Sequence, residues 1–357
     1  MTVYAFSSFS FGYLNRARVL AKTLKALHPD WAFWAVIVDT PPEGLDFDPE
    51  SEGFSGVLTA ADLFGGQTDA VLFGHDIVEA CTAAKGIAAT HLLEKTDCEK
   101  LFFFDPDIAL FNSMDEVVVL LDRFSIVLTP HQTDPEPREN KQAILDNEIA
   151  SLSYGVFNLG FVALANDAEG RRFAAWWAER LADWCWDRLD IGIFVDQKWC
   201  NLVPCFFDGV KILRDPGYNV ASWNLSQRKM HFDAAGQAQI NGRPLRFYHF
   251  TKLGPLGDQM TQRYAGENIE IFELWRWYRE QVAAGTDTAI PKGWWAYGQF
   301  DTGQPVPKSV RELYRNRVDL RTAFKSPFAT GDGSLLQWLE ANTNLLDKEE
   351  KRGFLPV

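Results

Sequence analysis

Two aspartates, Asp105 and Asp107, have the residue type and spacing that could bind a metal ion. They follow the apolar run 101–104 and are separated by Pro106. In a strand, alternate residues share a face, so both carboxylates can be directed at one point just past the strand end. Pro106 donates no hydrogen bond to a strand ladder, which fits a strand that ends there. Open α/β sheets bind ligands beyond the carboxyl ends of their strands, so we expect a site at this position.

These two carboxylates need a positive counter-charge, and no basic residue lies beside them in the sequence. At ~4 Å and an intermediate dielectric, the pair would repel by several kcal/mol. Hard oxygen ligands indicate Mg²⁺ or Mn²⁺, with the remaining positions left for water and phosphate oxygens. The same tripeptide is also common as an ordinary solvated acidic turn, and taken alone it fits that interpretation equally well.

His249 is the candidate for a third ligand. It is the one histidine of the aromatic segment 247–250, which we expect to be a strand. A lone histidine in such a run is usually a core residue with satisfied hydrogen bonds. A carboxylate pair that lacks a third ligand favours the metal site instead, and an imidazole would favour Mn²⁺ over Mg²⁺.

Three further polar residues interrupt apolar segments and could bind sugar hydroxyls. Asn158 and Gly160 lie in the apolar run 156–164, where an amide offers a donor and an acceptor and a glycine permits close backbone approach. The alternative is a β-bulge with a locally satisfied amide. Asp196 and Gln197 begin an expected helix, where they could bind hydroxyls or Asp196 could merely cap the helix.

The elements that position these residues alternate between strands and helices. A strand, a helix and a second strand with a short exit begin the chain, and this order is typical of a βαβ unit and a parallel sheet. We predict an α/β fold, with a mixed, mainly parallel sheet flanked by helices, over residues 1–260, and a helical subdomain over residues 261–357. The expected strands are 3–9, 31–38, 101–104, 125–129 and 156–164, and the expected helices are 13–27, 76–93, 171–186, 269–284, 310–317 and 335–342.

The composition of the chain limits the kinds of partner that it could bind and indicates its cellular compartment. The 357 residues include 35 basic and 48 acidic residues, and the formal net charge is -13. Without a Lys/Arg-rich run, nucleic acid and anionic membrane are poor candidate partners. The apolar start lacks a basic leader, and no run approaches the ~18 residues of a membrane span. Five cysteines without a CxxC pair are most simply buried thiols. We therefore expect a cytoplasmic protein without an integral membrane segment.

The order of motifs over residues 3–255 resembles that of family 8 glycosyltransferases and glycogenin, which have the GT-A fold. A bacterial branch of GT-A enzymes is more similar still, on the motifs Leu128-Thr129-Pro130-His131, Pro216-Gly217-Tyr218-Asn219-Val220 and Ser222-Trp223-Asn224-Leu225. The motifs shared with family 8 are Ser8-Phe9-Ser10 with Tyr13, Lys85, Asp105-Pro106-Asp107, Phe157-Asn158-Leu159-Gly160, Asp196-Gln197 and His249-Phe250.

The resemblance implies a role for each matching residue. Asp105, Asp107 and His249 match metal ligands of retaining enzymes that use Mn²⁺ and usually a UDP-sugar. The other matches are the nucleotide-binding residues Ser8, Ser10 and Tyr13, the donor-facing Lys85, and Asn158, Asp196 and Gln197 around the transferred sugar. Ser10 stands where the related enzymes have an amide side chain in the pocket for the base, so the identity of the nucleotide base is not determined. Thr251-Lys252-Leu253-Gly254-Pro255 replaces a Gly-x-x-Lys-Pro-Trp run, so Lys252 would reach the diphosphate from a different place.

The sequence therefore predicts a metal-dependent glycosyltransferase that moves a sugar from a nucleotide-sugar to a glycan or lipid-linked acceptor. If the configuration is retained, no strong base is needed; if it is inverted, Asp196 is the candidate base. Two other classes remain: a haloacid-dehalogenase-like phosphatase with Asp105 as nucleophile, and a non-catalytic sugar-binding protein. Aromatic residues that could form an acceptor platform, or simply pack in the core, are Trp275, Trp277, Tyr278, Trp294, Trp295 and Tyr297.

Overall fold

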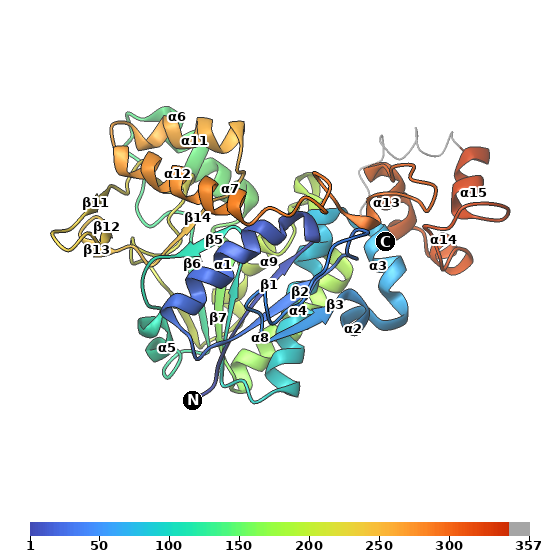
Figure 1. Cartoon of the computed structure of the whole chain (residues 1–357), viewed down its shortest axis with the longest axis horizontal. Helices are drawn as coiled ribbons and strands as arrows, with labels where there is room; N and C mark the ends of the chain where they lie inside the picture. Colours follow the sequence, from blue (N-terminus) through green and yellow to red (C-terminus); the bar gives the residue numbers. More distant parts are fainter. Residues whose placement is uncertain (343–357) are drawn as a thin grey trace.

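A seven-stranded sheet with the order β10-β6-β7-β4-β1-β2-β3 forms the centre of the computed structural model, which describes residues 1–342 (Figure 1). Neighbouring strands are parallel except at β7, which runs antiparallel to both β4 and β6. The predicted α/β fold with a mainly parallel sheet and flanking helices is confirmed. The strands are β1 (Val3–Phe9), β2 (Ala32–Ile37), β3 (Gly56–Thr59), β4 (Lys100–Phe104), β6 (Ile126–Pro130), β7 (Phe157–Ala165) and β10 (Val210–Ile212).

Helices cover both faces of this sheet because its central strands are apolar on both sides. Ala5 and Phe102 pack in the core beneath α1 (Leu14–Leu27) and α5 (Asp115–Leu120). Their neighbours Phe6 and Phe103 pack in the opposite core, beneath α4 (Ile77–Lys95) and α8 (Ala168–Trp184). This alternation is what a strand buried between two helical layers requires.

Helix α4 is held close to its neighbour α8, and this fixes the residues that α4 presents to the sheet edge. Asp76 caps the helix and forms a capping box with Glu79. Gly86 lies so near α8 that an added Cβ would stand 2.5 Å from the backbone nitrogen of Ala178. A larger residue at position 86 would therefore push the two helices apart.

Two short antiparallel strands lie beyond the end of β4. They are β5 (Ile108–Leu110) and β14 (Phe247–His249), which pair with each other outside the main sheet. The remaining strands form two small sheets. The three-stranded sheet contains β11 (Met230–Phe232), β12 (Ala238–Ile240) and β13 (Arg243–Pro244). The two-stranded sheet contains β8 (Asp187–Arg188) and β9 (Ile193–Phe194).

The C-terminal helices form two groups at opposite ends of the molecule (Figure 1). The helices α11 (Pro255–Ala265) and α12 (Ile269–Ala284) pack in one core, and α12 binds α1 through Gln281 and Lys22. The other group packs against α3 (Thr68–Gly74) and comprises α13 (Lys308–Asn316), α14 (Val318–Ala323) and α15 (Leu335–Ala341). The domain boundary predicted after residue 260 falls inside α11, and the division of the chain there remains a prediction.

Several short helices connect these elements. They are α2 (Ala60–Phe64), α6 (Lys141–Ala143), a π-helix (Ile144–Ile149), α7 (Ala150–Tyr154), α9 (Gln197–Cys200) and α10 (Val203–Phe206). Within residues 1–342, we find no helix with the length and apolar character needed to cross a bilayer. Cys205 is exposed, so the expectation that every thiol is buried is wrong for this residue.

Candidate metal and donor site

Asp105 and Asp107 lie in the turn that joins β4 to β5. The backbone N–H of Asp105 donates to the carbonyl of Gly160 on β7 at 2.8 Å, and the N–H of Ile108 donates back to the carbonyl of Asp105 at 3.1 Å. The two carboxylates therefore converge because the chain turns between them. The alternation along a strand that we used to bring them together is wrong, since β4 ends at Phe104.

His249 joins the two aspartates because β14 pairs with β5. His249 lies opposite Ile108 in this ladder, and the N–H of Phe250 donates to the carbonyl of Asp107 at 2.8 Å. The Nε2 atom of His249 lies 3.0 Å from Oδ1 of Asp107 and 3.8 Å from Oδ2 of Asp105. One ligand atom from each residue lies within 4.8 Å of the other two. We call Asp105, Asp107 and His249 the metal triad.

The other imidazole nitrogen of His249 has a partner that selects a tautomer. Its Nδ1 atom lies 3.2 Å from Oδ1 of Asn158, an oxygen that also accepts from the N–H of Gly160 and from Nδ2 of Asn219. Because an amide oxygen only accepts, Nδ1 carries the proton and donates it to Asn158. The lone pair of neutral His249 is then on Nε2, facing the aspartates, as a metal ligand requires.

The charges of the metal triad are coupled. Burial lowers the pKa of His249, but the carboxylates of Asp107 and Asp105 outweigh burial and raise it above its ordinary value. Burial likewise raises the pKa of Asp107, and the His249 imidazolium outweighs it and lowers this pKa. Without a cation, a protonated His249 can thus serve as counter-charge. A bound Mn²⁺ or Mg²⁺ would take that place; the two carboxylates suit either ion, and the imidazole favours Mn²⁺.

Lys85 links the metal triad to Asp196. It lies on α4 and is 5% exposed, with its Nζ atom 3.2 Å from Oδ1 of Asp105 and 3.2 Å from Oδ2 of Asp196. Burial lowers the pKa of Lys85, but the two carboxylates outweigh it and raise this pKa. Burial raises the pKa of Asp196 to about 6, although Lys85 stabilises its charged form. The Asp196 side chain makes no capping hydrogen bond to α9, so it is not held in place as a helix cap.

Asn158 also binds Gln197, which brings the two predicted sugar-binding amides together. Nδ2 of Asn158 donates to Oε1 of Gln197 at 3.2 Å and lies 3.1 Å from Nε2 of His131. Gly160 leaves the space that His249 occupies, since an added Cβ would stand 2.5 Å from Cε1 of that histidine. The predicted close approach at Gly160 is therefore made by a side chain. The alternative β-bulge is also present, because the pairing of β6 with β7 shifts register beside this position.

Ser8, Ser10 and Tyr13 lie at the carboxyl end of β1, beside the end of β4. The hydroxyl of Ser8 donates to the carbonyl of Cys81 on α4 at 2.7 Å. Ser10 is 1% exposed, and its hydroxyl has no hydrogen-bond partner in the described part of the chain. Tyr13 is 39% exposed, and the guanidinium of Arg16 lies 3.8 Å from the centre of its ring. Of these three residues, Tyr13 is the most exposed.

Lys252 is not part of this group. It lies exposed in the turn after β14 with a φ of 56°, and its ammonium forms no hydrogen bond or ion pair with another residue between 1 and 342.

Two of the candidate platform residues also lie elsewhere, in the core under β14. Trp275 donates to the hydroxyl of Tyr248, and the ring of Tyr278 stacks on that of Phe250 with centroids 3.8 Å apart. Both serve core packing, the alternative stated above.

Three residues of the site were not predicted from their own chemistry. Asn219 is 1% exposed and binds Asn158, while the ring of Trp223 lies 5.3 Å from the rings of both His131 and His249. Each lies in a motif quoted only for the resemblance. Asn219, like Asn158, is an amide beside apolar residues. The apolar stretch beside Asn219 is too short to be identified as a strand, so this signal was not used.

Comparison with known proteins gives distant matches. No protein-family model matches the chain. The uncharacterized protein YfnD of Bacillus subtilis (strain 168) is 27% identical over 180 residues, which are 48% of this chain; the chain spans about half of that protein, 53%. Similar solved structures include the galactosyltransferase LgtC in complex with donor and acceptor sugar analogs (TM-score 0.46, 16% identity, 82% of this chain and 99% of that chain). They also include the glycosyltransferase GlyE of Streptococcus pneumoniae TIGR4 (TM-score 0.44, 13% identity, 79% and 64%).

Proposed function

We propose that this chain is a metal-dependent glycosyltransferase of the GT-A type, which moves a sugar from a nucleotide-sugar to a glycan or lipid-linked acceptor in the cytoplasm. A UDP-sugar is the favoured donor, and retention is the expected outcome. The observation that carries the proposal is the convergence of Asp105, Asp107 and His249 within 4.8 Å, beside Lys85 and Asp196. This group lies at the carboxyl edge of a mainly parallel sheet, where open α/β folds bind ligands.

The local charge supports binding of a divalent cation and a diphosphate together. Asp105, Asp107 and Asp196 carry three negative charges when ionised, and Lys85 supplies one positive charge while His249 is neutral. A divalent cation would balance the remaining two. The overall charge of -13 would repel a nucleotide diphosphate, so the cation is also what makes this edge of the sheet attractive to the donor.

Each residue of the site has a separate role in the proposed reaction. Asp105, Asp107 and His249 would hold Mn²⁺ or Mg²⁺, which, when bound, stabilises negative charge on the departing diphosphate. Lys85 holds Asp105 in the orientation that faces His249 and keeps the buried Asp196 ionised. Asn158 fixes the imidazole through Nδ1, and with Gln197 offers amide groups to sugar hydroxyls. Asp196 lies beside this pair and would orient the sugar, or act as base if the configuration is inverted.

The test is hydrolysis of nucleotide-sugars, since a transferase slowly transfers its donor sugar to water. The protein is incubated with UDP-, GDP-, CDP- and ADP-sugars, with and without Mn²⁺, and nucleotide release is measured. We expect one donor to be hydrolysed only with the metal, and expect Asp105→Ala to lose this activity with the fold intact. Asp190→Ala, which removes an exposed carboxylate that binds Arg188, is the matched control and should keep it.

Two results would contradict the proposal. Undiminished metal-dependent turnover by Asp105→Ala would refute the role of the metal triad. Release of phosphate from simple phosphate monoesters, without hydrolysis of any nucleotide-sugar, would assign the chain to the phosphatase class instead.

A further inference from the structure

A segment of the C-terminal region, Trp294–Tyr297, crosses the carboxyl ends of β1 and β2. It lies between α12 and α13 and runs past these strand ends in Figure 1. The indole N–H of Trp294 donates to the carbonyl of Thr40 at 3.0 Å, and that of Trp295 donates to the carbonyl of Val38 at 3.3 Å. We call residues 294–297 the crossing segment.

Asp39 ties the crossing segment to the turn that follows β1. Its Oδ1 atom accepts from the backbone N–H of Ala296 at 2.8 Å and from that of Thr40 at 2.9 Å. Its Oδ2 atom accepts from the N–H of Phe11 at 3.0 Å. Asp39 is 8% exposed, so these backbone groups replace the water that a carboxylate normally binds. The segment is therefore held at a defined distance from the turn that carries Ser10 and Tyr13.

The crossing segment packs tightly on Gly12, and a buried polar group beside this contact indicates a site for a ligand. An added Cβ on Gly12 would stand 2.6 Å from the carbonyl oxygen of Trp294 and 3.6 Å from the hydroxyl of Ser10, so only glycine fits beside the crossing segment. The Ser10 hydroxyl is buried and has no hydrogen-bond partner among residues 1–342. A buried hydroxyl without a partner is costly, and a bound polar molecule would remove that cost.

Arg311 of α13 holds the crossing segment from the other side. Its Nη2 atom donates to the carbonyl of Tyr297 at 2.7 Å, and its guanidinium carbon lies 4.8 Å from the ring centre of Trp295. Its Nη1 atom binds three carbonyls at the end of α3, those of Leu72, Phe73 and His75.

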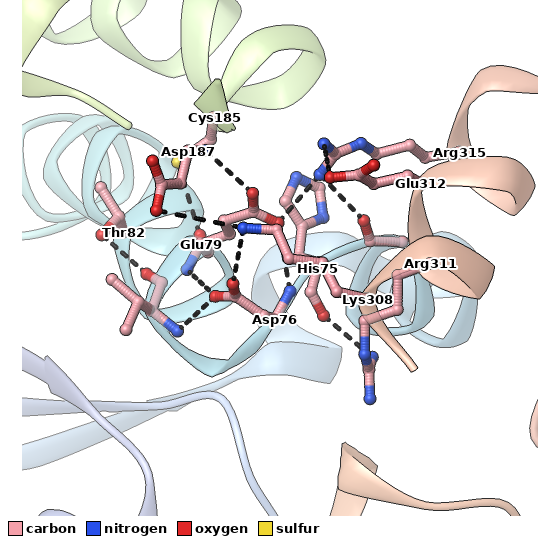
Figure 2. Close-up of polar contacts among 12 residues, drawn as sticks. His75, Asp76, Glu79, Thr82, Cys185, Asp187, Lys308, Arg311, Glu312 and Arg315 are labelled. Atoms are coloured by element: carbon pink, nitrogen blue, oxygen red, sulfur yellow. Dashed lines mark hydrogen bonds and ion pairs between the residues drawn. The ribbon is translucent and has the colours of Figure 1, made fainter. Parts of the chain in front are cut away.

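Figure 2 shows how α13 is itself fixed on the end of α4. Arg315 donates to the buried carboxylate of Glu79 at 2.9 Å, and Lys308 lies 3.5 Å from Asp76. The position of the crossing segment is thus set by the same helix, α4, that carries Lys85.

We infer that the crossing segment forms one wall of the pocket for the nucleoside of the donor, and that Arg311 is the residue that positions this wall. The inference rests on the proposed function. A donor whose diphosphate is held at the end of β4 must lay its nucleoside over a neighbouring strand end. On the β7 side, Asn158 and Gln197 occupy that place; on the β1 side lie Tyr13, the unpartnered Ser10 hydroxyl and two indole rings. Aromatic rings and a free hydroxyl are what a base and a ribose bind.

Two substitutions move the crossing segment without touching the metal triad. Gly12→Ala drives a methyl group against the carbonyl of Trp294. Ala296→Pro removes the N–H that binds Asp39; the preceding Trp295 is extended, and Ala296 begins a 3-10 turn, so the backbone accepts a proline there. Gly298→Ala is the matched control, because its added Cβ makes only an ordinary 3.7 Å contact with Trp295.

The experiment measures by calorimetry how each folded protein binds two probes in the presence of Mn²⁺. The first probe is the nucleoside diphosphate, among UDP, GDP, CDP and ADP, that binds the wild type most tightly; the second is inorganic pyrophosphate, which reports the metal triad alone. We expect Gly12→Ala and Ala296→Pro to weaken nucleotide binding about tenfold, the effect of one lost stacking or hydrogen-bond contact to the base or ribose. Pyrophosphate binding should stay unchanged in both, and Gly298→Ala should bind both probes like the wild type.

The results that would overturn the inference differ from those that would overturn the proposed function. Variants that bind the nucleotide as tightly as the wild type, or that lose pyrophosphate binding to the same extent, would show that the crossing segment is not a nucleoside wall. Arg311→Gln should also weaken only the nucleotide, and unchanged affinity would refute its positioning role. A wild-type protein that binds neither probe with Mn²⁺ would refute the proposed function, and with it this inference.

Discussion

Replacing Lys85 by methionine removes the cation that lies between two buried carboxylates. Methionine keeps most of the aliphatic stem, so the change is one of charge more than of volume. The side chain of Asp196 is 2% exposed and has no other cation near it in the described structure. We expect Lys85→Met to leave Asp196 as an uncompensated buried charge and to destabilise the fold.

The size of this destabilisation can be estimated from the two ion pairs that Lys85 forms with Asp105 and Asp196. At 3.2 Å and an effective dielectric constant of ~20, each ion pair is worth about 5 kcal/mol of Coulomb energy. Part of this is offset because the buried ammonium no longer has to be desolvated, so the net loss for breaking a buried pair is about 3–5 kcal/mol. If Asp196 is also changed to asparagine, the buried charge is gone, and we expect the double variant to regain about 2 kcal/mol over the single one.

Urea unfolding followed by circular dichroism measures these free energies for the wild type, Lys85→Met and the double variant. Removing the cation raises the pKa of Asp196 further above the ordinary value of a carboxyl. The folded single variant then binds a proton more readily than its unfolded chain, so its deficit relative to the wild type should shrink as the pH falls from 7.5 to 5. A single variant as stable as the wild type, or a double variant less stable than the single one, would refute this account of Lys85.

Three further outcomes follow from the same geometry. Asn158→Ala removes the acceptor for Nδ1 of His249 and should weaken Mn²⁺ binding 10- to 100-fold in calorimetry, whereas unchanged affinity would mean that the imidazole is oriented by other contacts. Gly160→Ala places a methyl group 2.5 Å from Cε1 of His249 and should also reduce Mn²⁺ affinity while the circular dichroism spectrum stays native; retained affinity would show that the imidazole is not a ligand. Burial raises the pKa of Asp39 to about 6 from 3.8, so the folded state binds more protons between these pH values and loses stability as the pH rises through them. The stability of the wild type relative to Asp39→Asn should therefore fall by up to about 3 kcal/mol from pH 4 to pH 7 in urea unfolding, and a constant difference would contradict the raised pKa.

Periodicity in the sequence was sufficient to predict five of the seven strands of the central sheet and the four longest helices, but not β3, β10 or most of the short elements. The strand at 3–9 and the helix at 269–284 have the predicted bounds, and the other main strands and helices lie within a few residues of theirs. The direction of β7 could not be predicted, because residues 157–165 are buried on both faces and an apolar run reads the same in either direction. The separation of α11 and α12 from α13–α15 depends on contacts between residues more than 200 positions apart, such as Arg311 with Leu72.

The residues of the candidate site were predictable from the sequence, but the contacts that bring them together were only partly so. The side chains of Asp105, Asp107 and His249 meet as expected, but through a turn and an outlying hairpin ladder, which local pattern does not distinguish from a longer strand. Lys85 is expected to face the donor, and its contacts with Asp105 and Asp196, 20 and 111 residues away, could not be predicted from the local pattern. Lys252 has a left-handed backbone conformation in the turn after β14, and its contact with the diphosphate remains a prediction.

The central claim is that one divalent cation binds between Asp105, Asp107 and His249. A crystal of the protein grown with Mn²⁺ and UDP, measured at a wavelength where manganese scatters anomalously, tests it most directly. We expect one strong anomalous peak bonded to a carboxylate oxygen of each aspartate and to Nε2 of His249, with phosphate oxygens completing its coordination. A peak bound by other residues, or none in a crystal that contains bound UDP, would contradict the claim.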